Sequence, residues 1–455
     1  MNLKNKSVLV VGLGKTGEAV CNFLIKRGAY VKVSEKGKAE EFDKKISYLS
    51  KKGVIFETGG HKINSFMETD LIVPSPGVPV IPEIARAKDS GIPVISEIEL
   101  AYKFLKGKIV GITGTNGKST TTTLTHKILK DAKLKTYLAG NIGTPLITFV
   151  NDSKEEDIYV LEISSFQLKH TEKFKPYVSV FLNISSDHLD WHEGFKDYYE
   201  AKKRIIKNQE ENDVCILNRD DNLVWNLKEG KKLNIYGFSQ KNKINKGCYI
   251  QKEWILLSNT KEKKLLKTSE IPLFGIHNQQ NIMAAALVGH ILGIPLSSIK
   301  KSIKSFKGLE HRLEKVLTIQ GIDFYNDSKA TNVDATIKSV QSFDKKIILI
   351  LGGKDKGGNF HQLINAVGNK TNKIILLGEA AGKILRVIGS SIPTVRVSSL
   401  KDAVNTGYSS AKPGEVVLLA PACTSFDMFH NFEERGDNFK KEIHLLEKQL
   451  KEKQA

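Results

Sequence analysis

Short runs rich in Val, Ile and Leu recur along the whole chain, and each is followed by Gly or Asn and then by helical periodicity. The runs occupy residues 7–11, 30–33, 71–73, 108–112, 158–161, 178–183, 214–218, 346–351, 373–377 and 415–420. They are continuously apolar rather than alternating, which is typical of parallel strands that helices bury on both faces. The sequence therefore predicts repeated α/β units built on parallel sheets.

The length of 455 residues is that of about three domains. The strand runs fall into three groups, and we expect domains over residues 1–96, 97–308 and 309–455. The Lys- and Glu-rich stretch 251–267 indicates an exposed hairpin or linker, and residues 440–455 form a polar, helix-forming tail.

The chain carries a formal charge of +19, but only eight of its 69 basic residues are Arg. Scattered lysines are typical of solvated helix faces, whereas nucleic-acid recognition favours clustered Arg with aromatic residues. We therefore expect no nucleic-acid partner, while a strongly anionic small substrate fits the charge. The four cysteines form no Cys-x-x-Cys pair, and no apolar run reaches the ~20 residues of a membrane span. These features predict a cytoplasmic protein without a membrane span.

The first strand run leads into a glycine-rich turn. Gly12, Gly14 and Gly17 follow the strand and open a helix, and Glu35 ends the next strand. Such glycines let the backbone approach a diphosphate, and the acidic residue can accept a hydrogen bond from a ribose hydroxyl. By itself the pattern favours NAD; the alternative is a tight turn without a ligand.

A second glycine-rich loop follows the strand run 108–112 and is the strongest single signal. It consists of Gly114, Thr115, Asn116, Gly117, Lys118, Ser119 and Thr120. In such a loop the backbone amides cradle phosphates, the Lys reaches the β and γ oxygens, and the Ser hydroxyl can hold Mg²⁺. Ile112 stands where the strict pattern has its first Gly, so a chance Gly-rich turn is the alternative. We expect an ATP or GTP site.

Acidic and imidazole side chains follow two further strand runs. Glu162 comes directly after run 158–161 and could hold a divalent metal or cap the next helix. Asp187, His188, Asp190 and His192 lie close together after run 178–183. They could ligate a metal or belong to a polar loop.

Two nucleotide fingerprints compete, since a dehydrogenase needs no phosphate-binding loop and a simple ATPase needs no first domain. The motifs taken in order resemble the Mur ligase family over nearly the whole chain. They are the loop 114–120, Glu162 with 164–167, and segments 187–190, 201–205, 277–281, 308–312, 326–332 and 421–427. Segment 431–436 resembles the members that add D-glutamate, and the Asp-Asn-Pro-Arg signature of the diamino-acid-adding member is absent from the sequence.

The resemblance implies a monomeric α/β enzyme of three domains: a Rossmann-like one, a P-loop ATPase-like one and a second Rossmann-like one. It implies that ATP activates UDP-N-acetylmuramoyl-L-alanine as an acyl phosphate, which the amine of D-glutamate attacks, with release of ADP and phosphate. This step belongs to peptidoglycan precursor synthesis. A carboxylate needs such activation because its oxygen is a poor leaving group.

The resemblance also implies the nucleotide and metal residues. The ATP site would comprise Gly114, Thr115, Asn116, Gly117, Lys118, Ser119, Thr120, Asn278, Asn281, Arg312, Asp327 and Lys329. Two Mg²⁺ ions are implied, with Ser119 on the first and Glu162 and His188 on the second. Lys202 matches the carbamylated lysine, a metal ligand; with Lys118, Glu162 and His188 it forms the implied catalytic set. Carbamylation requires a neutral amine, so the pKa of this lysine must fall from ~10.4. Spacing alone does not separate Lys202 from its neighbours Lys203 and Arg204.

The matching substrate residues lie in the outer domains and at one central position. For the UDP-sugar they are Lys15, Thr16, Glu35, Lys36, Ser75, Gly77 and Asn141. For D-glutamate they are Lys356, Ser425 and Phe432. Three alternatives stay open: another Mur or folylpolyglutamate-type ligase, a nicotinamide-dependent oxidoreductase, and a non-catalytic nucleotide-binding switch.

Overall fold

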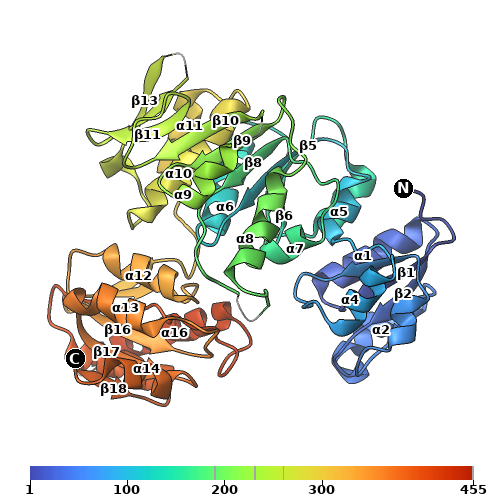
Figure 1. Ribbon diagram of the computed structural model, residues 1–455. Helices are drawn as coiled ribbons and strands as arrows, with labels where there is room; N and C mark the ends of the chain where they lie inside the picture. Colours follow the sequence, from blue (N-terminus) through green and yellow to red (C-terminus); the bar gives the residue numbers. More distant parts are fainter. Residues whose placement is uncertain (189–190, 230–231, 260, 453–455) are drawn as a thin grey trace. The chain divides into compact units, whose positions relative to one another are not determined.

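The computed structural model describes residues 1–188, 191–229, 232–259 and 261–452 and divides the chain into two compact units (Figure 1). Unit 1 comprises Met1–Ile184, Trp191–Thr268 and Asn281–Ile303, and unit 2 comprises Ser185–Asp190, Ser269–Gln280 and Lys304–Ala455. Three mostly parallel sheets with flanking helices confirm the predicted α/β class. The three domain boundaries expected from the sequence remain a prediction.

The amino-terminal sheet of unit 1 has the order β3-β2-β1-β4, and all its strands are parallel. Its strands are β1 (Ser7–Val11), β2 (Tyr30–Ser34), β3 (Ile55–Glu57) and β4 (Leu71–Pro74). Its helices are α1 (Lys15–Lys26), α2 (Asp43–Ser50), α3 (Ile63–Met67) and α4 (Pro82–Asp89). Helix α1 packs on β1 and β2 through Val20, Phe23 and Leu24. The turn between β1 and α1 therefore opens at the carboxyl edge of the sheet.

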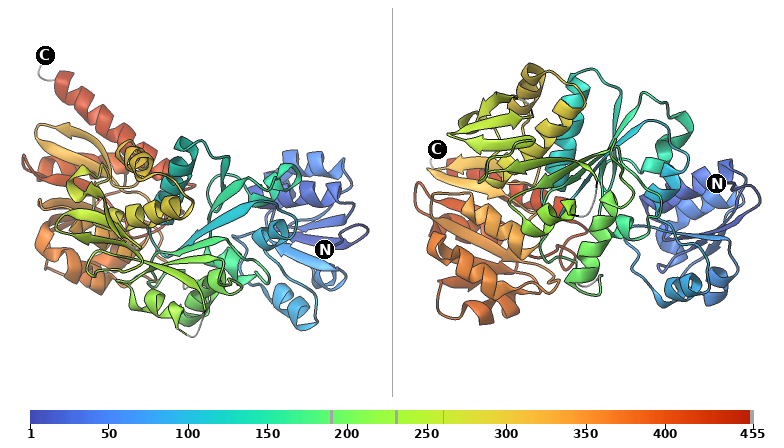
Figure 2. Two further views of the ribbon diagram at one scale, coloured as in Figure 1. Left: turned by 90° about the horizontal axis from the view of Figure 1, so that it is seen from above. Right: turned by 45° about the horizontal axis from the view of Figure 1, so that its top comes forward.

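The central sheet has nine strands in the order β13-β12-β11-β10-β9-β8-β5-β7-β6. Its strands are β5 (Lys108–Thr113), β6 (Thr136–Gly140), β7 (Ile158–Glu162), β8 (Val178–Phe181), β9 (Val214–Asn218), β10 (Asn234–Ser239), β11 (Gly247–Gln251), β12 (Trp254–Ser258) and β13 (Glu262–Lys267). Helices α6 (Lys118–Asp131), α7 (Ser165–Lys169), α8 (Phe195–Lys203), α9 (Asn222–Trp225), α10 (His277–Ile291) and α11 (Leu296–Lys304) follow. Figure 2 shows helices on both faces of this sheet, which explains why its inner strands are continuously apolar.

Unit 2 contains a six-stranded sheet in the order β14-β15-β19-β16-β17-β18, in which only the β14–β15 pair is antiparallel. Its strands are β14 (Glu314–Ile319), β15 (Ile322–Asn326), β16 (Ile347–Gly352), β17 (Thr371–Leu377), β18 (Thr394–Arg396) and β19 (Val416–Leu419). Its helices are α12 (Val333–Gln341), α13 (Phe360–Val367), α14 (Ala381–Ile388), α15 (Leu400–Ser410) and α16 (Phe432–Glu452). The carboxyl ends of β15, β19 and β16 are neighbours, so the loops that follow them share one edge.

Helix α5 (Glu97–Tyr102) connects the amino-terminal and central sheets and carries two buried carboxylates. Glu97 accepts a hydrogen bond from Ile147 N at 2.6 Å, at the start of the 3₁₀-helix Leu146–Asp152. Glu99 accepts hydrogen bonds from the backbone amides of Glu172, Lys173 and Phe174. Both side chains thus fix α5 to loops of the central sheet.

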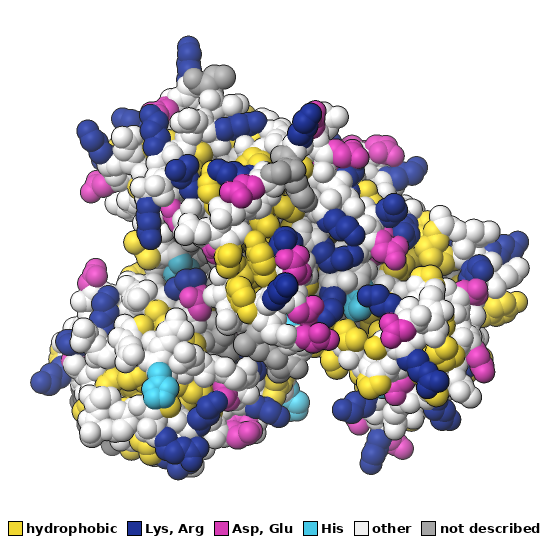
Figure 3. All heavy atoms as spheres, viewed as in Figure 1, with side chains coloured by type: hydrophobic (Ala, Val, Ile, Leu, Met, Phe, Trp, Pro, Cys, Tyr) yellow, Lys and Arg dark blue, Asp and Glu magenta, His cyan; other side chains and the backbone are white. Residues whose placement is uncertain are grey.

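Each apolar run singled out in the sequence forms a strand. The stretch 251–267 contains the antiparallel β12–β13 pair, as the expected hairpin requires. Strands such as β6, Thr136–Gly140, were not predicted, because their sequences mix polar and small residues with apolar ones. Figure 3 shows Lys and Arg side chains dispersed over the visible face with Asp and Glu among them. Within the described ranges, no helix is both long and apolar enough to cross a membrane.

Candidate functional site

The phosphate-binding loop predicted from residues 114–120 lies at the carboxyl end of β5, directly before α6. Thr115 N donates to Asn183 O at 3.0 Å, and Asn116 N donates to Asn183 Oδ1 at 2.8 Å. Asn183 follows β8, the strand beside β5, so the neighbouring strand holds the loop in place. Ser119 and Thr120 are buried in the first turn of α6. The amides at this helix start form a site suited to phosphate.

Two features of the loop depend on Gly117 and Lys118. Gly117 has φ +87°, and a Cβ there would lie 2.2 Å from Asn281 Oδ1. Only glycine combines that conformation with that approach. Lys118 Nζ donates to Gly114 O at 2.9 Å and to Thr115 O at 2.8 Å, which holds the ammonium over the loop.

Glu162 ends β7, the strand that pairs with β5 on the side opposite β8. Its Oε1 accepts a hydrogen bond from Asn141 Nδ2 at 2.7 Å. Its Oε2 is buried and has no hydrogen-bond partner in the part of the chain that the structure describes. Ser164, not Glu162, caps α7, because its hydroxyl accepts from Gln167 N. Because Ser164 caps α7, the capping alternative for Glu162 is excluded. A buried carboxylate oxygen without a partner fits a divalent cation, so metal binding by Glu162 stays a prediction.

The structure separates Lys202 from its neighbours. Lys202 is 1% exposed, and its Nζ donates to Gly114 O at 2.9 Å. Lys203 instead pairs with Glu200 at 2.8 Å near the surface, and Arg204 donates to Thr171 O. Of these three residues, only Lys202 reaches the phosphate-binding loop.

His192 is held by hydrogen bonds at both ring nitrogens. Its Nδ1 lies 2.7 Å from Asp197 Oδ2, and its Nε2 lies 2.9 Å from Ser165 Oγ. Burial lowers the pKa of His192, and Asp197 opposes this effect only in part. A neutral ring therefore donates from Nδ1 and accepts at Nε2. Both nitrogens are occupied, so His192 acts as a structural link between α7 and α8 and not as a metal ligand.

The other members of that polar loop differ from His192. Asp187 Oδ1 lies 3.4 Å from Lys356 Nζ, and Asp187 Oδ2 accepts from Asn332 Nδ2 at 2.9 Å. His188 has φ +54°, and its side chain is about one-third exposed. Asp190 lies outside the described residues.

In the amino-terminal domain, Glu35 binds its own turn. Its carboxylate accepts from Leu13 N at 2.6 Å and from Gly37 N at 2.9 Å. A Cβ at Gly17 would lie 2.0 Å from Gly12 O, so this glycine allows the close packing of α1 on the turn. The glycine pattern and Glu35 are accounted for by this turn, which weakens the argument for a nicotinamide cofactor.

Other residues predicted for the UDP-sugar lie around the same turn. Ser75 Oγ donates to Gly12 O at 3.0 Å. Lys15 Nζ donates to Gly143 O at 2.7 Å, in the loop that follows β6. Asn141 lies in that second loop and, through its amide, contacts Glu162. Thr16 is partly exposed at the start of α1, and Lys36 and Gly77 are exposed.

The residues predicted to reach ATP from the third domain lie at the carboxyl edge of the unit 2 sheet. Asp327 is buried after β15, and its pKa is raised to about 6 because burial outweighs the hydrogen bond from Ser339 and the charge of Arg312. Lys329 Nζ lies 3.6 Å from the ring centroid of Phe432. Lys329, which is predicted to bind ATP, and Phe432, which is predicted to bind D-glutamate, are therefore neighbours.

Ser425 and Lys356 complete this edge. Ser425 is buried in the loop after β19, and Lys356 lies in the loop after β16. Ser425 O accepts backbone hydrogen bonds from Met428 and Phe429, which close a tight turn. Arg435 is buried beneath it, donating to Ser328 O at 2.8 Å and to the carbonyls of Cys423 and Thr424. The guanidinium thus joins the two loops that carry Lys329 and Ser425.

The two asparagines predicted for adenine lie at the start of α10. Asn278 Nδ2 donates to Phe274 O at 2.7 Å, so its side chain fixes the turn before the helix. Asn281 Oδ1 accepts from Thr121 Oγ1 at 3.3 Å, beside Gly117. Asn281 therefore lies at the phosphate-binding loop.

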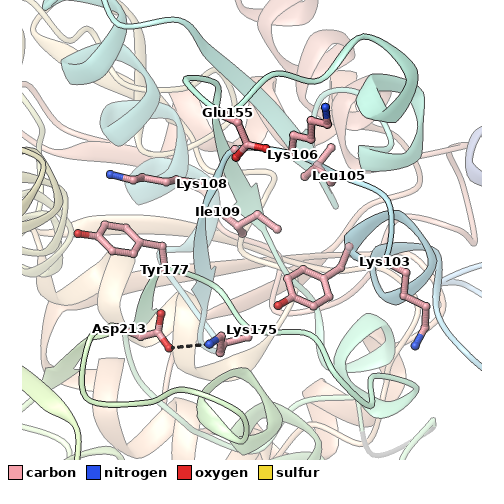
Figure 4. A pocket seen from close by; sticks show the side chains of 11 residues that line it. Lys103, Leu105, Lys106, Lys108, Ile109, Glu155, Lys175, Tyr177 and Asp213 are labelled. Carbon is pink, nitrogen blue, oxygen red and sulfur yellow. Dashed lines mark ion pairs between the residues drawn. The ribbon is translucent and has the colours of Figure 1, made fainter. Parts of the chain in front are cut away.

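A cavity of about 530 Å³ lies away from this loop, at the amino ends of β5, β8 and β9 (Figure 4). Figure 4 shows Tyr177 and Lys108 on one side and the Lys175–Asp213 ion pair on another. Because the phosphate-binding loop follows the carboxyl end of β5, this cavity is not the nucleotide site.

In unit 2, Glu310, His311 and Asp437 bring three donor atoms within 4.8 Å of one another. Lys440 Nζ lies 3.1 Å from Asp437 Oδ1 and already supplies a cation there. Asn326 Nδ2, 3.0 Å away, faces His311 Nδ1. A metal-bound imidazole would instead need an acceptor at that nitrogen. The cluster therefore does not resemble a metal site.

Sequence reasoning did not select Asn183, Tyr198 or Asn332. Asn183 lies two residues after β8, and its position near a strand's carboxyl end was the available signal. Tyr198 OH lies 3.0 Å from Thr115 Oγ1, a contact between residues far apart in sequence that no local pattern reveals.

Comparison with known proteins gives three family matches in chain order. Residues 6–96 match the Mur ligase MurD-like N-terminal domain, residues 112–289 the Mur ligase middle domain, and residues 311–423 the Mur ligase glutamate ligase domain. A protein of Acidobacterium capsulatum named UDP-N-acetylmuramoylalanine--D-glutamate ligase is 45% identical over 444 residues, 97% of this chain and 96% of that one. A protein of the same name from Koribacter versatilis is 42% identical over 453 residues, covering 99% of this chain and 100% of that one.

Solved structures show the same fold. A pseudomurein peptide ligase type C from Methanothermus fervidus matches with a TM-score of 0.60 at 20% identity, covering 92% of this chain and 97% of that one. The UDP-N-acetylmuramate-alanine ligase MurC from Thermotoga maritima also gives 0.60, at 19% identity over 97% and 99% of the two chains.

Proposed function

Because the chain belongs to the Mur ligase family, we propose that it is the ATP-dependent enzyme that joins D-glutamate to UDP-N-acetylmuramoyl-L-alanine. Two relatives that bear this name are 45% and 42% identical to it over almost the whole chain. The product is a peptidoglycan precursor. The protein's four cysteines are free and buried, which fits a reducing cytoplasm, as do the nucleotide-linked substrates of the proposed reaction.

The observation that carries the proposal is the group of side chains around the loop 114–117. Lys118 and Lys202 both donate to Gly114 O, and Glu162 presents a buried oxygen on the next strand. Phosphoryl transfer needs the triphosphate held in a fixed position with its charge offset. The amides at the start of α6 and the Lys118 ammonium supply both conditions.

The donor set fits Mg²⁺, which prefers hard oxygen ligands. Ser119 would hold a first ion, and Glu162, His188 and a carbamylated Lys202 would hold a second. When bound, Mg²⁺ offsets the negative charge of the phosphates and of the reacting carboxylate. In the same assignment, Lys118, Glu162, His188 and Lys202 form the catalytic set. Gly114, Thr115, Asn116, Gly117, Thr120, Asn278, Asn281, Arg312, Asp327 and Lys329 complete the ATP site.

The two remaining substrates bind at sheet edges. Lys15, Thr16, Glu35, Lys36, Ser75, Gly77 and Asn141 are assigned to the UDP-sugar. Lys356 and Ser425 are assigned to the carboxylates of D-glutamate, with Phe432 packing beside them. A Lys ammonium and a Ser hydroxyl donate to carboxylate oxygens, and a charged partner makes these hydrogen bonds stronger than neutral ones.

The test is amide formation by the purified protein with Mg²⁺, ATP and UDP-N-acetylmuramoyl-L-alanine. We expect ADP, phosphate and a new D-glutamyl product by mass spectrometry with D-glutamate, and far less with L-glutamate or diaminopimelate. Preference for another amino acid would identify a different ligase of the superfamily. Titration with NADH tests the oxidoreductase alternative, and ATP turnover without either co-substrate would favour a nucleotide switch.

A further inference from the structure

We propose that Asp187 is an internal carboxylate that occupies an anion site formed by Lys356 and Asn332, and that D-glutamate must displace it in order to bind. The proposal rests on the proposed function, because it concerns the binding of the amino-acid substrate. All three residues belong to unit 2, although Asp187 comes from the segment Ser185–Asp190.

The Asp187 carboxylate contacts donors at both oxygens, among them its neighbour His188, whose backbone N–H donates to Oδ1 at 2.9 Å and whose Nε2 lies 3.7 Å from Oδ2. Lys356 Nζ lies 3.4 Å from Oδ1, and Asn332 Nδ2 donates to Oδ2 at 2.9 Å. The side chains of Lys356 and Asp187 are 18% and 9% exposed. An ammonium and an amide N–H that face the two oxygens of one carboxylate make an anion site.

The Asn332 side of this site is fixed by the helix that it caps. Asn332 Oδ1 accepts from Ala335 N at 2.8 Å, as the N-cap of α12. This bond determines the orientation of the amide, so Nδ2 points to Asp187. The positive end of the nine-residue helix α12 adds a favourable field for an anion at the same place.

The Lys356 side is fixed by its own loop. Asp355 Oδ1 accepts from Gly357 N at 3.0 Å and from Gly358 N at 2.9 Å, which closes the turn around Lys356. Asp355 also pairs with Lys383. Asp355 is thus engaged with its own turn and with Lys383, and Lys356 is directed to the carboxylate of Asp187.

A carboxylate of D-glutamate has the same charge and the same two acceptor oxygens as Asp187. Two like-charged carboxylates cannot share one ammonium at close range, so binding of one weakens binding of the other. Removing the charge of Asp187 weakens its own binding to the anion site, while the donors of Lys356 and Asn332 stay in place. An ion pair of this partly buried kind corresponds to about a threefold to tenfold change in affinity.

The first test compares Asp187→Asn with Asp334→Asn, which removes the same charge from a neighbouring residue that pairs with Lys338 at 2.8 Å. We expect Asp187→Asn to lower the KM for D-glutamate about threefold to tenfold, with kcat changed less than about twofold. Asp334→Asn should leave this KM unchanged. An unchanged or raised KM in Asp187→Asn overturns the proposal, since a purely structural aspartate would lower kcat or stability instead.

A second comparison tests the shared site. Asn332→Ser keeps an oxygen that can cap α12 but removes the amide donor. In the native protein, Asn332→Ser weakens the binding of both the Asp187 carboxylate and D-glutamate at this site. In the Asp187→Asn variant it weakens the binding of D-glutamate alone. We therefore expect a larger increase in the KM for D-glutamate in the double variant, relative to Asp187→Asn, than in the single one. Equal increases would overturn the proposal. If Asp187→Asn does not fold, Asp187→Ser takes its place in both comparisons.

The proposed function and the competition by Asp187 can be refuted separately. If the native protein forms no D-glutamyl product, the proposed function fails. If it forms product but the KM for D-glutamate does not respond to Asp187→Asn, only the competition by Asp187 is refuted.

Discussion

Lys202 Nζ donates to the carbonyl oxygen of Gly114 at 2.9 Å, so a lysine of α8 contacts the residue that opens the phosphate-binding loop. Lys202 is 1% exposed, whereas Lys203 pairs with Glu200 near the surface. The two adjacent lysines therefore have different environments, and they provide a matched pair for experiment.

Replacing Lys202 with Ala should reduce amide formation at least a hundredfold, because the proposed carbamate supplies an anionic oxygen that Ala lacks. A short-chain carboxylic acid should restore part of the activity, and bicarbonate should restore less. Lys203→Ala is the control and should keep near-normal activity. Absence of rescue by any acid would leave Lys202 without the carbamate role.

Lys118→Ala should abolish ATP turnover, because the variant lacks the ammonium that is held over the loop by Gly114 and Thr115. Binding of UDP-N-acetylmuramoyl-L-alanine, measured by calorimetry, should persist, since its main residues lie in the amino-terminal domain. Lys127→Ala, on the same helix and paired with Asp131, is a suitable control. Unreduced turnover in Lys118→Ala would contradict the assignment of the phosphate-binding loop.

Glu99→Ala should lower the free energy of unfolding by about 3 kcal/mol, because three backbone amides lose a buried carboxylate partner. Burial alone would raise the pKa of Glu99, but the hydrogen bonds from residues 172–174 and Lys103 lower it below its ordinary value. Its contribution is therefore present above the ordinary pKa and is lost as the pH falls below it.

Urea midpoints for Glu99→Ala and Glu172→Ala at pH 7 check this expectation. Glu172 is exposed and donates only through its backbone, so its truncation leaves the network intact. Equal midpoints for the two variants would show that the Glu99 carboxylate does not stabilise the fold.

Glu97 should show the opposite dependence on pH. Burial raises its pKa to about 7, and the amides of Ile147 and Leu146 oppose this only in part. The folded state therefore holds a proton that the unfolded state releases above pH ~4.5, so this residue reduces stability as the pH rises towards 7.

Glu97→Gln should remove that dependence. We expect the variant to match the native protein near pH 5 and to exceed its free energy of unfolding at pH 8 by up to about 3 kcal/mol. Denaturant midpoints at the two pH values provide the measurement. A variant that is less stable at pH 8 would show that the ionised carboxylate is needed there.

Local patterns were sufficient wherever a function depends on adjacent residues. The runs at 108–112 and 158–161 predicted β5 and β7, and the glycine and acidic residues after them predicted which loops carry the site. A parallel sheet brings the carboxyl ends of its strands to one edge, and Gly114 and Glu162 lie at the ends of β5 and β7. Sequence order does not show that these two strands are neighbours, because β6 lies between them in the chain.

Contacts between distant segments could not be obtained in this way. The sequence determined the α/β class, the phosphate-binding loop and the set of polar residues around it, because these follow from short-range periodicity and turn chemistry. Only the tertiary structure decided that Lys202 and not Lys203 reaches the loop, that His192 is fixed between Ser165 and Asp197, and that Asp187 pairs with Lys356. These outcomes depend on burial and hydrogen bonding between residues far apart in the chain, which no local pattern specifies.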